Sequence, residues 1–201
     1  GVICPNKNSK QFSQYLNTIH QKVSVDSKKE YILDYPGFSQ AFGLPLDLPL
    51  PEQSDWHHCR EPRQEVDKST GARSLRNELI KIIENLMSSS NPNVVVIFIP
   101  NRWHKWESYD EAGESFDLHD FIKAYCVQKG ISTQFIREST LYKSYKCEIM
   151  WWLAQSLYTK SMRTPWILKE MDDETAFVGL GYGLDYSHGK GKHVILGCSH
   201  I

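Results

Sequence analysis

Hydrophobic residues recur at helix and strand spacing along most of the chain, and this pattern predicts alternating helices and strands. Apolar side chains three and four positions apart predict helices over residues 9–23, 74–87, 115–130 and 141–160. Short apolar or β-branched runs predict strands over residues 1–5, 30–35, 93–99 and 131–136. The run NVVVIFI at 93–99 is apolar throughout, which is typical of a central parallel strand covered on both faces. The alternation from residue 74 to 160 therefore predicts an α/β fold, specifically a Rossmann-like sandwich.

The ends of the helices and the connecting segments carry local signals of their own. Ser115 is suited to cap the helix that follows it, and Gly130 is suited to end that helix. Residues 36–68 are rich in proline, charge and aromatic side chains, so we expect an irregular, packed loop there with at most short helical turns. In the helix over 141–160, Tyr145 and Trp152 fall on the stripe predicted to face the core.

Composition bounds the kinds of ligand and compartment. The formal net charge of −1 over 201 residues argues against bulk polyanion binding, so any nucleic acid must meet a local basic pocket. Five scattered cysteines form no CxxC pair, which favours a reduced, cytoplasmic setting over a disulfide framework or zinc site. No apolar run approaches the ~20 residues that a membrane-spanning helix needs. Because strand-like text stands at both ends and no methionine opens the chain, we expect a piece of a longer protein.

Four side chains near the helix over 115–130 could bind a phosphate. His119 and Lys123 are four residues apart on that helix and so share a face. Gln134 lies on the next strand, and Lys160 ends the next helix; imidazole, ammonium and carboxamide groups all donate hydrogen bonds to phosphate. In a simple sandwich, His119 would lie nearer Lys146 than Lys160, since those lysines are about four helical turns, or ~20 Å, apart. The residues that follow Lys160, discussed below with the family resemblance, nevertheless favour Lys160, and Lys146 is kept as a secondary candidate.

The loop PNRWHKWESYDEAGES follows the central strand, and open α/β sheets bind ligands outside the carboxyl ends of their strands. Arg102, His104 and Lys105 could meet phosphates or base edges, and Trp103 and Trp106 could stack on a base. Packing of the same aromatic rings onto the domain is an equally weighted alternative.

The combination of His119, Lys123, Gln134 and Lys160, followed by SMRTPWIL at 161–168, resembles the 5′-phosphate pocket of the Argonaute MID domain. The resemblance implies a MID domain over 1–165, with its core at 74–165, and the beginning of an RNase H-like PIWI domain over 166–201. It implies that the loop at Arg102, Trp103, His104 and Lys105 contacts the first guide base.

The C-terminal part of the sequence is relevant to catalysis. Residues 175–183 and 193–198 read as two strands of a hairpin, and PIWI domains deliver a metal-binding aspartate from such a first strand. Here Gly181 stands at that position, and Asp185 lies four residues further on. The resemblance therefore implies a catalytically inactive short prokaryotic Argonaute with no catalytic residues.

The resemblance also implies partners. It predicts a guide RNA or DNA with a 5′-phosphate, a complementary target strand, and an APAZ-containing effector protein with a TIR, sirtuin-like or nuclease domain, acting in defence against invading nucleic acid. No cofactor is implied for catalysis, and Mg²⁺ is allowed at the guide 5′ end. Two alternatives stay open: an active PIWI nuclease using Asp185, and an unrelated α/β domain that binds a small phosphorylated ligand.

Overall fold

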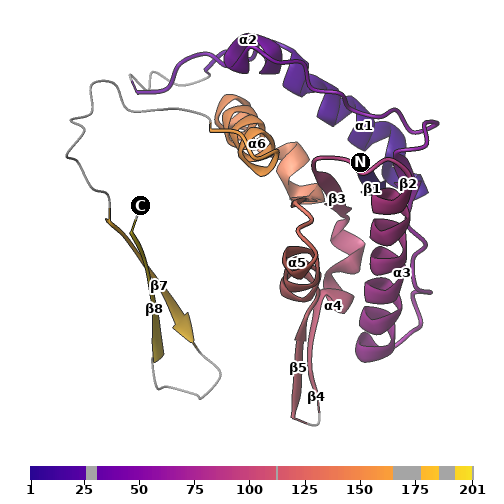
Figure 1. The fold of residues 1–201 in the computed structure, drawn as a ribbon. Helices are drawn as coiled ribbons and strands as arrows, with labels where there is room; N and C mark the ends of the chain where they lie inside the picture. The colour runs from indigo at the N-terminus through magenta and orange to yellow at the C-terminus, as the bar shows by residue number, and fades with distance from the viewer. Residues whose placement is uncertain (26–30, 112, 165–177, 186–192, 201) are drawn as a thin grey trace. The chain divides into compact units, whose positions relative to one another are not determined.

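The computed structural model describes residues 1–25, 31–111, 113–164, 178–185 and 193–200 (Figure 1). Contacts divide the chain into two units, Gly1–Pro165 and Trp166–Ile201. Among the described residues no helix is both long enough and apolar enough to span a membrane.

The first unit is built on a four-stranded parallel sheet. Its strands are β1 (Val2–Cys4), β2 (Trp56–His58), β3 (Val95–Ile99) and β6 (Thr133–Arg137), in the order β2-β1-β3-β6. Val96 pairs with Val2 on one side and Gln134 on the other, which makes β3 central and β6 an edge strand. All five residues of β3 are buried, as an apolar strand covered on both faces requires. The predicted mixed α/β architecture is confirmed.

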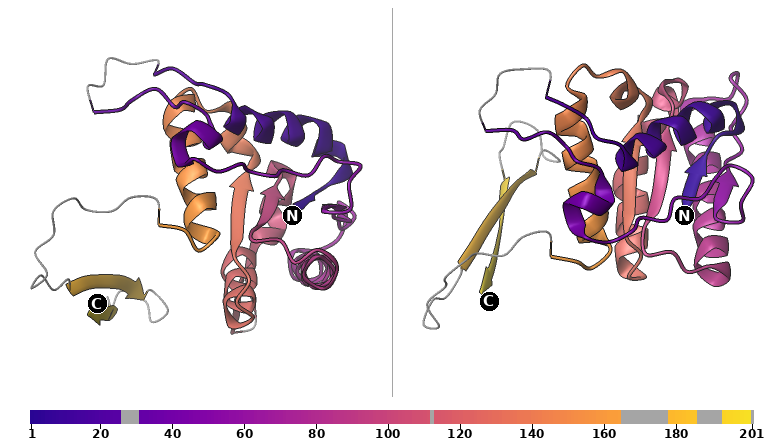
Figure 2. Two further views of the ribbon diagram at one scale, coloured as in Figure 1. Left: turned by 45° about the horizontal axis from the view of Figure 1, so that its top comes forward. Right: turned by 90° about the horizontal axis from the view of Figure 1, so that it is seen from above.

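Helices cover both faces of this sheet, and the views in Figure 2 place its strands between α3 and α6. One buried cluster joins the sheet to α1 (Ser9–Asn17), α2 (Phe38–Phe42) and α6 (Lys146–Lys160). The opposite cluster joins it to α3 (Lys68–Ser89), α4 (His104–Glu107) and α5 (Leu118–Gln128). A hairpin of β4 (Ser108–Glu111) and β5 (Glu114–Asp117) precedes α5, and short 3₁₀ turns occupy Asn6–Asn8, Thr18–His20, Asn101–Trp103 and Glu138–Tyr142.

The start of α5 differs from the prediction. Asp117, rather than Ser115, caps the helix by accepting a hydrogen bond from the Asp120 amide at 2.9 Å. Ser115 is instead paired with Asp110 in the β4–β5 hairpin, so its backbone is extended. Gly130 follows the helix with φ +69°, a left-handed conformation that glycine adopts without a steric penalty.

Two predictions about strands were wrong. Residues 31–35 form no strand, and Tyr35 makes only an isolated bridge to Val23. Residues 36–68 contain the short helix α2 and also the strand β2, because Trp56–His58 pairs in parallel with β1. Pairing with a distant strand, which no local pattern records, decides this second case.

The predicted buried stripe of α6 is also partly wrong. Ile149, Leu153 and Leu157 are buried as expected, but Tyr145 is 47% exposed and Trp152 is 50% exposed. Trp152 therefore lies on the surface of α6 and not in the core.

The second unit contains an antiparallel pair, β7 (Val178–Asp185) and β8 (His193–His200), which confirms the predicted hairpin strands. Gly181 pairs with Gly197, and Asp185 pairs with His193 at the far end of the ladder. Asp185 is thus four residues from Gly181, or about 13 Å along a regular strand. The second domain was expected to start at residue 166, and residues 166–177 lie outside the described part of the chain.

Candidate functional site

The free edge of β6 is covered by side chains from the two helices that flank it. The Ser132 carbonyl accepts the Val95 amide within the sheet, so the next carbonyl, that of Thr133, faces the free edge. Lys123 Nζ reaches across from α5 and donates to the Thr133 oxygen at 2.7 Å. Lys123 is therefore held at the amino end of β6.

Gln134 connects the amino end of β6 to α6, which packs on the other face of the sheet. Its side-chain amide nitrogen donates to the Phe135 carbonyl at 2.8 Å. Its side-chain oxygen accepts hydrogen bonds from Ser156 Oγ, at 2.6 Å, and from Lys160 Nζ. Since Gln134 is only 4% exposed, it positions Lys160 and does not itself present a donor to solvent.

The two ammonium groups consequently lie close together. Burial, followed by the charge and close approach of Lys123, lowers the pKa of Lys160 to about 8. Within the described part of the chain, neither ammonium forms an ion pair with a carboxylate. Two adjacent cations without an anionic partner form a local positive site on a chain of net charge −1, and such a site can bind a phosphate or another compact anion.

His119 lies beside this site, one helical turn before Lys123 on α5. Its ring meets the Phe135 ring edge-on, with centroids 4.8 Å apart, and Lys123 Nζ lies 5.7 Å from the same ring. His119 Nδ1 is also hydrogen-bonded to the Asp120 carboxylate at 2.9 Å. Because Asp120 brings negative charge to the imidazole, an anion is favoured nearer Lys123 and Lys160 than nearer His119.

His119 and two exposed carboxylates near it could hold a cation. Ligand atoms of Asp117, His119 and Asp120 all lie within 4.8 Å of one another. Carboxylate and imidazole ligands suit several divalent ions, and the expectation of Mg²⁺ at the 5′ end of a guide strand stays a prediction.

Lys146 does not join the cluster. It begins α6, whereas Lys160 ends it, and Lys146 lines a cavity of about 340 Å³ with Tyr15 and Met150. This arrangement follows from the direction of the elements, because α6 runs in the opposite direction to the strand β6 that precedes it. The last turn of α6 lies beside the amino end of β6, where Gln134 and Thr133 stand. The simple-sandwich argument that placed Lys146 nearer His119 than Lys160 was therefore wrong.

The loop after β3 occupies the opposite end of the sheet. Trp103 and Trp106 are fully buried, so the expected stacking of these rings on a base is wrong, and the packing alternative holds. Arg102 donates to both oxygens of Glu61, at 2.6 and 2.9 Å, and the Trp103 indole donates to the same carboxylate.

The remaining loop cations are also separated from the edge site. Lys105 donates to the Gln64 carbonyl and lies over the Trp106 ring, while His104 is exposed near Glu107. Thr133 and Arg137 stand at opposite ends of β6, about 13 Å apart along the strand. The structure therefore does not bring this loop to Lys123 and Lys160.

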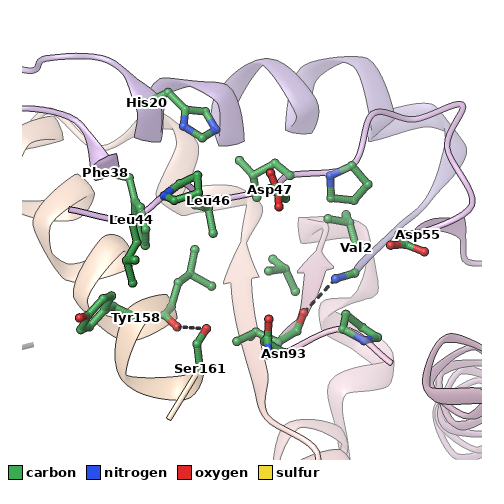
Figure 3. Close-up of a pocket in the computed structure, with 18 of the residues that line it drawn as sticks. Val2, His20, Phe38, Leu44, Leu46, Asp47, Asp55, Asn93, Tyr158 and Ser161 are labelled. Atoms are coloured by element: carbon green, nitrogen blue, oxygen red, sulfur yellow. Dashed lines mark hydrogen bonds between the residues drawn. The ribbon is translucent and has the colours of Figure 1, made fainter. Parts of the chain in front are cut away.

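The large cavity of the first unit is a separate feature (Figure 3). It measures about 860 Å³ and lies between the loop at residues 44–49, the amino ends of β1 and β3, and the last turn of α6. His20, Asp47 and Asp55 contribute polar groups to walls that are otherwise rich in leucine and proline. None of the side chains predicted from the sequence to bind a phosphate or a base lines it.

Sequence reasoning missed Ser156 and Phe135. Ser156 precedes Lys160 by four residues, so the i, i+4 rule could have placed both on one face of α6. Phe135 is apolar and so gave no sign of a binding site in the sequence. Its contact with His119 depends on which face of β6 the helix α5 covers.

No protein-family model matches the chain, and no curated protein matches it.

Proposed function

We propose that Lys123 and Lys160 bind the terminal phosphate of a nucleic-acid strand, and that the chain is the guide-binding part of a catalytically inactive short prokaryotic Argonaute. In this proposal the first unit is a Rossmann-like MID domain, and the second is the start of a PIWI domain. Guide-directed target binding would act through an APAZ-containing effector in the prokaryotic cytoplasm.

One observation carries the proposal: two ammonium groups from different helices are held side by side with no carboxylate to neutralise them within the described chain. Gathering like charges costs free energy in the unliganded protein, and a dianionic phosphate would reverse that cost. Lys123 and Lys160 are 37 residues apart in sequence, and a hydrogen bond to Gln134 holds Lys160 in place.

A structural alternative accounts for part of this geometry. Exposed strand edges are commonly blocked by lysines, and Lys123 and Gln134 do satisfy edge carbonyls of β6. Edge protection does not require Lys160, whose ammonium bonds a glutamine oxygen that Ser156 already satisfies. Lys160 is therefore the residue whose presence favours a ligand.

The test compares binding of 5′-phosphorylated and 5′-hydroxyl oligonucleotides to the protein. We expect Lys123→Ala with Lys160→Ala to abolish the preference for the 5′-phosphate, whereas Lys143→Ala with Lys146→Ala, a matched pair at the other end of α6, should keep it. Retention of the preference in the first double variant would refute the assignment of the pocket.

Two further measurements separate the two alternatives. A nucleoside monophosphate bound as tightly as an oligonucleotide would favour a small-ligand domain. Metal-dependent strand cleavage that is lost in Asp185→Ala would favour an active nuclease over the inactivity proposed from Gly181.

A further inference from the structure

Trp152 is exposed in a way that the fold does not explain. Its side chain is 50% exposed, whereas Trp56, Trp103 and Trp106 are at most 4% exposed. The neighbouring Trp151 is partly buried and donates its indole N–H to the Leu33 carbonyl at 2.9 Å. Among the described tryptophans, Trp152 thus offers half of a large apolar side chain to solvent.

Its position on α6 links it to the two-lysine site. Trp152, Ser156 and Lys160 are spaced four residues apart, so they form one row along the helix. Ser156 and Lys160 in that row both bond Gln134 at the edge of β6. Tyr145, which directly precedes α6, is a second exposed aromatic residue, at 47%.

The row has the length of a short oligonucleotide. Eight residues separate Trp152 from Lys160, which corresponds to about 12 Å along the helix. Stacked nucleotides advance about 3.4 Å each along a strand, so three to four nucleotides cover that distance. A ligand anchored at Lys160 must therefore be a strand, and not a mononucleotide, to reach Trp152.

We propose that Trp152 is a stacking platform for a base a few nucleotides from the phosphorylated end of a single strand. This inference rests on the proposed function, because the phosphate at Lys123 and Lys160 sets the position of the strand. Every base presents a π-face, so the contact favours strand length and not sequence. Stacking on one aromatic side chain strengthens binding by about 5- to 150-fold.

The experiment measures binding of three probes to the full chain: inorganic phosphate, a 5′-phosphorylated mononucleotide and a 5′-phosphorylated single-stranded decamer. We compare Trp152→Ala, Trp152→Phe and Tyr31→Ala with the unaltered protein. Tyr31 is 80% exposed and is the matched control, since it is another exposed aromatic residue and lies two residues before Leu33, whose carbonyl accepts the Trp151 indole N–H.

We expect Trp152→Ala to weaken decamer binding by at least fivefold, with phosphate and mononucleotide binding unchanged and with substantial rescue by Trp152→Phe. Equal decamer affinities for Trp152→Ala and Tyr31→Ala would overturn the inference while leaving the phosphate site intact. A uniform loss for all three probes would also overturn it, because the effect of Trp152 would then not depend on the length of the strand. Equal binding of 5′-phosphate and 5′-hydroxyl decamers by the unaltered protein would instead refute the proposed function, and this inference with it.

Discussion

Replacing Lys160 with methionine should stabilise the unliganded protein while destroying phosphate binding. The pKa of Lys160 is lowered from 10.5 to about 8 by burial and by the adjacent Lys123. A difference of one in pKa corresponds to 1.36 kcal/mol, so holding the charge at pH 7 costs at most about 3.4 kcal/mol of folding free energy. Partial exposure and screening reduce this cost to about 1–2 kcal/mol.

Methionine keeps the length of the side chain and removes the charge. The Gln134 oxygen keeps its hydrogen bond from Ser156, so no buried acceptor is left without a partner. After allowance for the lost hydrogen bond from Lys160, we expect a net stabilisation of about 1 kcal/mol at pH 7.

Urea unfolding at several pH values, with Lys146→Met as the control, measures this effect. In the unfolded chain the Lys160 ammonium keeps its proton up to about pH 10.5, whereas in the folded chain it loses that proton near pH 8. The free energy of unfolding of the unaltered protein therefore rises as the pH rises from 8 to 10.5. The advantage of Lys160→Met should therefore shrink between pH 8 and 10.5. A destabilisation at pH 7, or a difference that does not change with pH, would show that Lys160 has a structural role only.

Three further predictions follow from other contacts. Phosphate binding should be strongest between about pH 6 and 8, because the ligand loses its second charge below pH ~6 and Lys160 loses its own above about 8; titration calorimetry across pH checks this. Glu61→Ala should cost about 2–3 kcal/mol in urea unfolding, because Arg102 and the buried Trp103 indole lose their acceptor, with phosphate affinity unchanged. Gly71→Ala should cost about 1–3 kcal/mol or more in the same assay, since its Cβ would lie 2.2 Å from the Trp106 ring. A Gly71→Ala protein as stable as the unaltered one would contradict the described packing of α3 on α4.

Local patterns predicted the elements that contain their own signals. The helix α3 and the strand β3 were predicted correctly from their apolar residues. An element that buries an apolar face repeats apolar residues at its own period, and the sequence shows that repeat directly. Residues 56–58 carry no such period, and only pairing with β1 makes them a strand. Ser115 looked like a helix cap, but pairing across the β4–β5 hairpin leaves that role to Asp117.

The sequence by itself determined which groups could bind a phosphate, because residue type and four-residue spacing set chemistry and helix face. Only the tertiary structure decided that Lys160, and not Lys146, lies beside Lys123. The directions of α5, β6 and α6 bring these distant residues to one end of an edge strand, and the same packing buries Trp103 and exposes Trp152. Contacts between residues far apart in the chain depend on how whole elements pack, and no local pattern contains that information.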